Sequence, residues 1–260
     1  MKRRTFNKVA AVGALGLGVA GPAHSSKKRP SHILSLSFDD GFKKSFYTTA
    51  DIFEKYGLSA CFNVIASGHL PGFEAVGEYI LPEILGDFSD WNALVRRGHE
   101  VMPHSWKHAN LGKAPEQEAR DLIEKCLTYF EENLEGYDPQ KAVFNFPFNS
   151  STKELNDWTA AKVRAVRTGG GGALNPMPDR APATLYCESK GPENIDDWVE
   201  DKVATFLKGE GGWLILNTHG LGDEGWGPMT AERLDLMLGR WVKVKGLEIM
   251  PVGKALEKYG

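Results

Sequence analysis

Short apolar runs alternate with amphipathic segments along most of this 260-residue chain. The runs are of strand length and rich in β-branched or aromatic residues, and the segments between them carry helix start and stop signals. Such alternation builds a parallel sheet covered by helices, either closed as a barrel or open and doubly wound. The predicted strands span residues 33–37, 60–65, 99–103, 142–146, 164–168, 184–187, 213–218 and 247–251.

Helices are expected in the gaps between these strands. Apolar residues recur at helical spacing from Phe46 to Tyr56, and Gly57 supplies a C-terminal stop. Pro115 opens a second amphipathic helix that extends to Phe130. The Ser-Thr-Lys-Glu sequence at 151–154 has the spacing of a capping box, which predicts a third helix.

The first 25 residues are predicted to be an export signal, leaving one folded domain over residues 26–260. Paired arginines, Arg3 and Arg4, precede a small, apolar, Gly-rich stretch at 9–20, and small residues that suit cleavage follow. This pattern resembles a twin-arginine signal. A membrane anchor is the alternative, but the stretch is shorter than the roughly 20 residues that span a bilayer. We expect a periplasmic or secreted protein with no membrane span in its mature form.

Charge and cysteine content limit the partners further. The predicted signal carries four basic residues and no acidic one, so its removal changes the formal net charge from −3 to −7. Nucleic acid is therefore not an expected partner. The odd number of cysteines, Cys61, Cys126 and Cys187, in apolar surroundings predicts buried thiols rather than a disulfide framework. The sequence gives no signal for an oligomeric state.

Three polar segments follow predicted strands: Ser-Phe-Asp-Asp-Gly at 37–41, His-Ser-Trp-Lys-His at 104–108, and Asn-Thr-His-Gly at 217–220. Catalytic groups of (β/α) barrels lie at the carboxyl ends of strands. Separate structural explanations exist for each: a surface histidine pair, a helix cap and a strand-end histidine. A single metal site would account for all three segments at once.

The residue types in these segments suit a metal-assisted hydrolase. The spacing of His104 and His108 puts two imidazoles on one side of a helical turn, where both reach one ion at about 2.0–2.1 Å. The adjacent carboxylates of Asp39 and Asp40 repel each other after a buried strand, so a cation or hydrogen bonds must compensate. A bound metal would then activate water for hydrolysis.

These motifs resemble those of the polysaccharide deacetylases of carbohydrate esterase family 4, the NodB-homology domain, over roughly residues 31–258. The family's first motif reads Thr/Ser-Phe-Asp-Asp-Gly, its second reads His-Ser/Thr-x-x-His, and a late strand ends in a catalytic histidine, here His219. The order and separation of the three agree. The resemblance implies a distorted (β/α) barrel of NodB type, with fewer intact units than the eightfold barrel.

The resemblance also implies a role for each residue. Asp40, His104 and His108 would bind a divalent metal, usually zinc, and Asp39 would be the general base. His219 would protonate the leaving amine, because an amine anion is a very poor leaving group.

The third family motif, Arg-x-Pro-Tyr, is altered here. Pro147 is kept, but Asn145 replaces the arginine and Phe148 replaces the tyrosine. Because that arginine normally orients the base, we expect Arg167 or Arg164, from the next predicted strand, to supply the charge. Asn145 would add a hydrogen bond to Asp39 without a positive charge.

The fourth motif, Asp-x-x-Asp-Trp, is matched only in part, by residues 194–198. Its Trp198 either lines an acetyl pocket or is a core residue of a helix predicted over 195–207. Pro147, Phe148 and Trp198 are the candidate substrate-binding residues.

Other residues near the motifs have two interpretations each. Trp106, Phe148 and Trp226 either stack on a sugar face or belong to the core. Asp223 and Glu224 are expected to be solvated loop charges, the alternative being sugar hydroxyl ligands. The long segment 67–90 forms part of a rim over the site or merely connects two elements.

The sequence thus predicts a metal-dependent hydrolase that removes N-acetyl or O-acetyl groups from an extracytoplasmic polysaccharide or oligosaccharide. One alternative is hydrolysis of another small non-peptide C–N bond. Another is a non-catalytic glycan-binding module on the same fold, which the altered third motif makes credible. Retention of the five polar residues Asp39, Asp40, His104, His108 and His219 argues against such a loss of activity.

Overall fold

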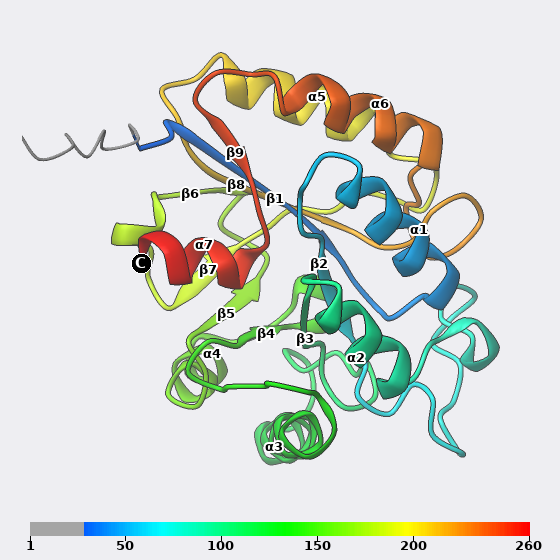
Figure 1. Cartoon of the computed structure of the whole chain (residues 1–260). Helices are drawn as coiled ribbons and strands as arrows, with labels where there is room; N and C mark the ends of the chain where they lie inside the picture. The colour runs from blue at the N-terminus through cyan, green and yellow to red at the C-terminus, as the bar shows by residue number, and fades with distance from the viewer. Residues whose placement is uncertain (1–28) are drawn as a thin grey trace, which may run out of the picture.

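A computed structural model describes residues 29–260, in which strands and helices alternate (Figure 1). The predicted export signal lies outside the described residues. The strands are β1 His32–Phe38, β2 Cys61–Val64, β3 Glu100–Pro103, β4 Val143–Asn145, β5 Ala165–Thr168, β6 Leu174–Asn175, β7 Thr184–Tyr186, β8 Gly212–Thr218 and β9 Leu247–Ile249. The α-helices are α1 Lys43–Glu54, α2 Phe88–Arg96, α3 Glu116–Asn133, α4 Lys153–Ala160, α5 Asp196–Leu207, α6 Ala231–Trp241 and α7 Val252–Tyr259. Short 3₁₀ turns are η1 Pro82–Ile84, η2 Pro147–Asn149 and η3 Pro178–Arg180.

Strand β1 lies at the centre of the larger sheet, whose order is β3-β2-β1-β8-β6 with β9 also on β1. It pairs in parallel with β8 along its whole length, from His32 opposite Gly212 to Phe38 opposite Thr218. The β2 partner covers only the carboxyl end of β1, and β9 covers only its amino end. This register places the residues that follow β1 and β8 side by side.

A second, three-stranded parallel sheet, β4-β5-β7, completes the ring. At one seam Glu188, just after β7, forms a parallel bridge with Leu216 of β8. At the other, the side-chain amide of Asn145 on β4 donates to the Pro103 carbonyl at the end of β3 over 3.3 Å. The strands therefore form a distorted (β/α) barrel with irregular seams, as predicted, and not an open doubly wound sheet.

Every strand predicted from the sequence is present, with bounds that differ by one or two residues. The two-residue strand β6, antiparallel to β8, was not predicted because it is too short to carry a periodic signal. Helix α4 begins one residue later than the capping-box spacing indicates: Thr152 is its N-cap and accepts from Leu155 N over 3.1 Å. Segment 67–90 contains η1 and the beginning of α2.

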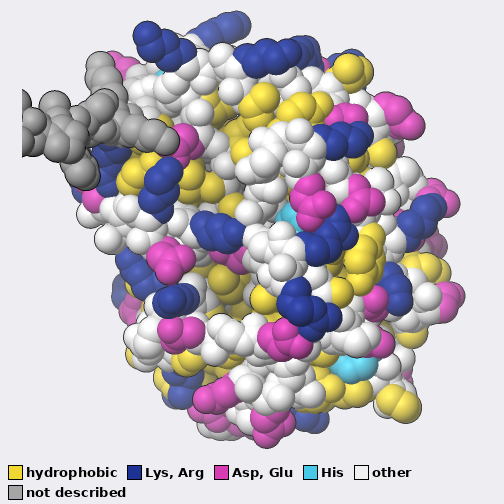
Figure 2. Space-filling view, in the orientation of Figure 1, with side chains coloured by type: hydrophobic (Ala, Val, Ile, Leu, Met, Phe, Trp, Pro, Cys, Tyr) yellow, Lys and Arg dark blue, Asp and Glu magenta, His cyan; other side chains and the backbone are white. Residues whose placement is uncertain are grey.

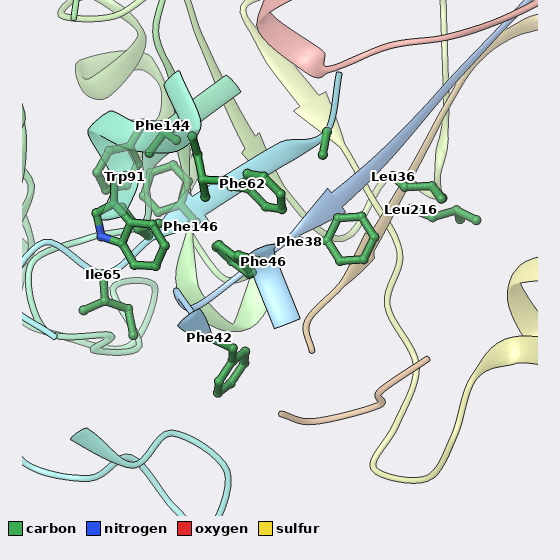
Figure 3. Packing of buried hydrophobic residues seen from close by; sticks show 14 of the residues in the cluster. Leu36, Phe38, Phe42, Phe46, Phe62, Ile65, Trp91, Phe144, Phe146 and Leu216 are labelled. Carbon is green, nitrogen blue, oxygen red and sulfur yellow. The ribbon is translucent and has the colours of Figure 1, made fainter. Parts of the chain in front are cut away.

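Aromatic side chains fill the space between the β1–β2 edge and helices α1 and α2 (Figure 3). The rings of Phe46 and Phe62 stack with centroids 4.5 Å apart, and Trp91 packs on Phe46 at 5.6 Å. Full burial of each such ring stabilises the fold by about 1.5–3 kcal/mol. Phe38, also fully buried, is the last residue of β1, so this core fixes the point at which the chain leaves the sheet toward Asp39 and Asp40.

All three cysteines are buried free thiols, as predicted. Within residues 29–260, no helix is both long and apolar enough to cross a membrane. Acidic and basic side chains are interspersed on the face shown in Figure 2, with hydrophobic side chains between them.

Candidate active site

The five polar residues that the motifs singled out line one cavity of about 480 Å³ at the carboxyl ends of the strands. Asp39 and Asp40 follow β1, His104 follows β3, and His219 follows β8. The cavity is lined by Asp39, Asp40, Val76, Gly77, Tyr79, Ile80, His104, His108, Phe148, Asn149, Ser189, Asn217, His219 and Trp226.

Left-handed backbone places several of these side chains. Asp40 has φ 82°, Ser105 has φ 69° and His108 has φ 54°. In residues other than glycine such angles cost about 1–3 kcal/mol each, and they persist where the surrounding structure imposes them. Here they turn the chain sharply after β1 and β3, so that Asp40, His104 and His108 converge.

The side chains of Asp40, His104 and His108 form a buried triad whose ligand atoms all lie within 4.8 Å of one another. Asp40 Oδ1 lies 3.4 Å from His104 Nε2 and 3.2 Å from His108 Nε2. Ligands about 2.0–2.1 Å from a tetrahedral metal are separated by about 3.3 Å, so these distances suit one ion.

Hydrogen bonding in the triad also fits a cation. Among the described residues, Asp40 Oδ1 is buried and accepts no hydrogen bond. His104 Nδ1 lies 2.9 Å from the carbonyl oxygen of Asn145, which can only accept, so Nδ1 carries the hydrogen and Nε2 is free to bind a metal. Burial would raise the pKa of Asp40, but the neighbouring imidazoles of His108 and His104 lower it well below its ordinary value.

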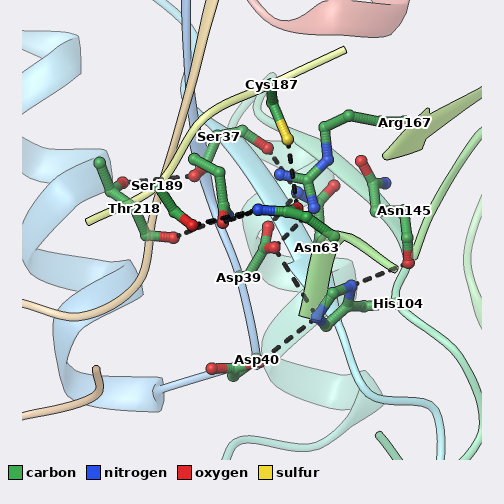
Figure 4. Close-up of polar contacts among 12 residues, drawn as sticks. Ser37, Asp39, Asp40, Asn63, His104, Asn145, Arg167, Cys187, Ser189 and Thr218 are labelled. Atoms are coloured by element: carbon green, nitrogen blue, oxygen red, sulfur yellow. Dashed lines mark hydrogen bonds and ion pairs between the residues drawn. The ribbon is translucent and has the colours of Figure 1, made fainter. Parts of the chain in front are cut away.

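Both oxygens of Asp39 accept a hydrogen bond from a buried side chain (Figure 4). Asn63 Nδ2 donates to Oδ1 and Arg167 Nη2 donates to Oδ2, each over 2.6 Å. Burial would raise the pKa of Asp39, but the charge of Arg167, followed by that of His104, lowers it below its ordinary value. The carboxylate is therefore held charged and in one orientation beside the triad.

Of the two candidate arginines, the structure brings Arg167 to Asp39. It is fully buried on β5 and directly opposite Asn145 in the β4–β5 register. Paired residues of neighbouring parallel strands point to the same side of the sheet, so the charge missing at position 145 is supplied at the same level, one strand away. Arg164 precedes β5, at the opposite end of the strand.

The prediction that Asn145 binds Asp39 is wrong. Its side-chain amide donates instead to the carbonyls of Val143, over 2.8 Å, and Pro103, over 3.3 Å. Both hydrogens of the amide are used by these two carbonyls, so none is left for Asp39. Asn145 nevertheless serves the site through its backbone carbonyl, which orients His104.

His219 lies across the cavity and has no hydrogen-bond partner on Nδ1 among the described residues. Its ring meets that of Trp226 edge to face, with centroids 5.6 Å apart. Burial lowers the pKa of His219, and the nearby charges of Asp40 and Asp39 oppose this only in part.

Aromatic and apolar side chains form the mouth of the cavity. Phe148 is 54% exposed, has φ 58°, and places its ring 4.7 Å from that of His108. Trp226 and Tyr79 line other parts of the wall. Residues 76–80 belong to the segment 67–90, which thus forms part of the rim over the site. Pro147, which precedes Phe148 in η2, is buried and does not line the cavity.

Two of the tryptophans lie elsewhere. Trp198, on α5, packs against the core and lines a separate cavity, with Lys202 Nζ 5.8 Å from its ring centroid. It therefore does not line the cavity that holds the five polar residues, because α5 covers the outside of the barrel. Trp106 points toward α3, where it packs on Tyr129 with centroids 5.4 Å apart.

Sequence reasoning assigned no role to two polar residues that lie on strands. Asn63 on β2 and Asn217 on β8 are buried, and each interrupts an otherwise apolar strand. That interruption is a usable signal, since buried amides need partners. Asn149 Nδ2 contacts Asn217 Oδ1 and Ser189 Oγ, over 3.3 and 3.1 Å, so these three form a polar wall of the cavity.

Glu224 corrects another expectation, since it is not a solvated loop charge. Its carboxylate accepts hydrogen bonds from the backbone N–H and the hydroxyl of Ser45 at the beginning of α1. Asp223, the preceding residue, is exposed as expected.

A family model described as polysaccharide deacetylase matches residues 26–172, more than half of the chain. The chain therefore belongs to the polysaccharide deacetylase family, the NodB-homology family of carbohydrate esterases. A search of curated proteins found no match.

Solved structures with the same fold include peptidoglycan deacetylase PdaC from Bacillus subtilis, with a TM-score of 0.55 and 18% identity over 87% of this chain and 91% of that one. The catalytic domain of a peptidoglycan N-acetylglucosamine deacetylase from Eubacterium rectale gives a TM-score of 0.55 and 19% identity, over 86% and 89%. A family pseudoenzyme from Bacillus anthracis gives a TM-score of 0.57 and 17% identity, over 88% and 66%. At these identities the likeness establishes the fold, which catalytic and non-catalytic proteins share.

Proposed function

We propose that this chain is a metal-dependent deacetylase that hydrolyses an acetyl group on a glycan outside the cytoplasm. The observation that carries the proposal is the buried Asp39 carboxylate, held charged by Arg167 beside a triad suited to a metal. Burying a charged pair is costly and adds little to stability. A charged carboxylate facing the cavity is, however, what a general base requires.

The triad of Asp40, His104 and His108 would hold a divalent ion, and two imidazoles with one carboxylate favour zinc. When bound, such an ion lowers the pKa of water and polarises a carbonyl oxygen. The remaining steps belong to the protein. Asp39 accepts a proton from the attacking water while the water oxygen bonds to the acetyl carbon.

His219, on the other side of the cavity, would donate a proton to the departing nitrogen as the C–N bond breaks. Acetate and a free amino sugar result. His219 must carry a proton for this step, although burial lowers the pKa of its imidazole. The proton that Asp39 takes from water balances the one that His219 gives.

The cavity walls suit an uncharged sugar. Apart from Asp39, Asp40 and the three histidines, the described lining residues are apolar, aromatic, amide or hydroxyl side chains and one glycine. Tyr79, Phe148 and Trp226 offer flat faces for the apolar side of a sugar ring, and Asn149 and Ser189 offer hydrogen bonds to hydroxyls.

The test is acetate release from N-acetylated chitooligosaccharides, O-acetylated xylan and peptidoglycan by the zinc-loaded protein. We expect release from at least one substrate, and none by the Asp39→Asn variant. Glycan binding without acetate release from any of the three, in protein that holds zinc, would contradict the proposal and favour the binding-module alternative.

We also propose export by the twin-arginine route, supported by Arg3 and Arg4 before the apolar stretch. Replacing both with lysine should retain the precursor in the cytoplasm, measured by cell fractionation. Normal export of that variant would indicate the general secretory route.

A further inference from the structure

The loop after His219 is closed at its base. Gly222 N donates to Met229 O over 2.8 Å, and Met229 N donates to Gly220 O over 3.1 Å. Within the loop, Gly225 has φ 84° and lies so close to His219 that a Cβ atom there would be 3.1 Å from His219 Cβ. The position of the loop therefore bears directly on His219.

Glu224 fixes this loop to α1. Its Oε2 atom accepts from Ser45 N over 3.1 Å and from the Ser45 hydroxyl. Ser45 Oγ in turn accepts from Leu221 N, in the same loop, over 2.8 Å. Ser45 is 2% exposed, so these bonds are shielded from water.

Helix α1 lacks a cap of its own, which Glu224 supplies from a distant part of the chain. The N-cap residue is Phe42, which has no side-chain acceptor, and the first turn contains no acidic residue. Its first two residues, Lys43 and Lys44, are basic and unfavourable at the positive end of the helix dipole. A carboxylate on the N–H of Ser45 satisfies an unpaired donor and offsets the dipole.

The contact also joins the two halves of the catalytic site. Strands β1 and β8 stay paired as far as Phe38 and Thr218, and Asp39 N donates to Thr218 O over 3.0 Å. Beyond that point the segment after β1 leads to α1, and the segment after β8 leads to His219. The Glu224–Ser45 contact joins these two segments again, beyond Asp39 and Asp40 on one segment and beyond His219 on the other.

We infer that Glu224 is a positioning residue, which holds His219 in its place in the cavity wall, where it can donate a proton to the leaving amine. The inference rests on the proposed function, in which His219 protonates the leaving amine. Trp226 adds to the effect, because its ring packs between His219 and Gly191, where a Cβ atom would lie 2.6 Å from the ring. A loop freed from α1 would release both His219 and Trp226.

The test compares two substrates that differ in their need for an acid. Hydrolysis of an N-acetyl sugar needs a proton on the leaving amine, whereas an aryl acetate ester has a good leaving group and does not. Glu224→Ala should lower kcat for the N-acetyl substrate by at least about tenfold, with KM changed less. Its kcat for the aryl acetate should stay within about threefold of the parent value, and its zinc content should not change.

Three variants complete the experiment. His219→Ala should show the same selective loss, larger in size. Glu224→Gln keeps an acceptor for Ser45 and should recover most of the N-acetyl activity, and it also serves if the alanine variant folds poorly. Asp223→Ala removes the neighbouring exposed acid and should leave both activities unchanged.

An equal loss on both substrates, loss of zinc, or no loss at all in Glu224→Ala would overturn the positioning role while leaving His219 as the acid. If His219→Ala itself spares the N-acetyl substrate, then the proposed proton donor is wrong, and the role of Glu224 is wrong with it. The two failures are therefore distinguishable.

Discussion

Arg167 donates a 2.6 Å hydrogen bond to Asp39 from β5, although the family motif places the corresponding arginine on β4, where this chain has Asn145. Asn145 and Arg167 are paired in the β4–β5 register, so the positive charge lies one strand away from the motif position, at the same level of the barrel. The long side chain of Arg167 reaches Asp39 from β5. In the structure, a guanidinium group contacts Asp39 even though the third motif lacks its arginine.

Replacing Arg167 with Met should lower turnover by roughly ten- to a thousandfold, the range for loss of one orienting electrostatic group. Zinc content should stay the same, because Arg167 contacts none of the three triad residues. The measurement is kcat alongside metal analysis. Arg164→Met is the matched control and should be close to the parent. An unchanged kcat in both arginine variants and in Asp39→Asn would mean that Asp39 is not a base.

The same substitution should move the acid limb of the pH–rate profile. Arg167 lowers the pKa of Asp39, so the base stays charged and active as the pH falls toward the ordinary carboxyl range. Without that charge, burial dominates and the pKa rises, so activity should be lost at higher pH than in the parent. The check is kcat/KM against pH for both proteins. A shift of the acid limb to lower pH would contradict the assignment.

Removal of the metal should abolish activity, which zinc or cobalt should restore. We expect about one ion per chain, with His104→Ala and His108→Ala each lowering occupancy, as measured by elemental analysis. His219→Ala should keep its ion while losing turnover of the N-acetyl substrate. Full activity in metal-free protein would rule out the proposed mechanism.

Asn145→Ala should affect stability more than catalysis. Its buried amide donates to the carbonyls of Val143 and Pro103 and so links β3 to β4. Leaving these carbonyls unpaired should cost about 1–3 kcal/mol in the free energy of unfolding, measured with denaturant. Turnover should fall less than in Arg167→Met, because the carbonyl that orients His104 belongs to the backbone. A kcat loss as large as that of Arg167→Met would indicate a direct role for the amide.

Much of the site could be predicted from the chain because its parts are local. Apolar runs of strand length gave all but the two-residue strand β6, and the polar residues directly after β1, β3 and β8 share one end of the barrel for that reason alone. Asp39, Asp40, His104, His108 and His219 needed no knowledge of packing beyond this rule.

Other features depended on which segments meet. The choice between Arg167 and Arg164 was set by the β4–β5 register, which a list of residues does not contain. Trp198 lies on the outer face of the barrel although its motif suggested a pocket, because the packing of α5 decides which way it points. The sequence predicts that Glu224 is a solvated loop charge, whereas the fold brings it to Ser45, 179 positions away. Hydrophobic periodicity acts over a few residues and determined the elements and the strand-end motifs. Only the tertiary structure, through strand register and packing between distant segments, decided which charges and aromatic rings face the same cavity.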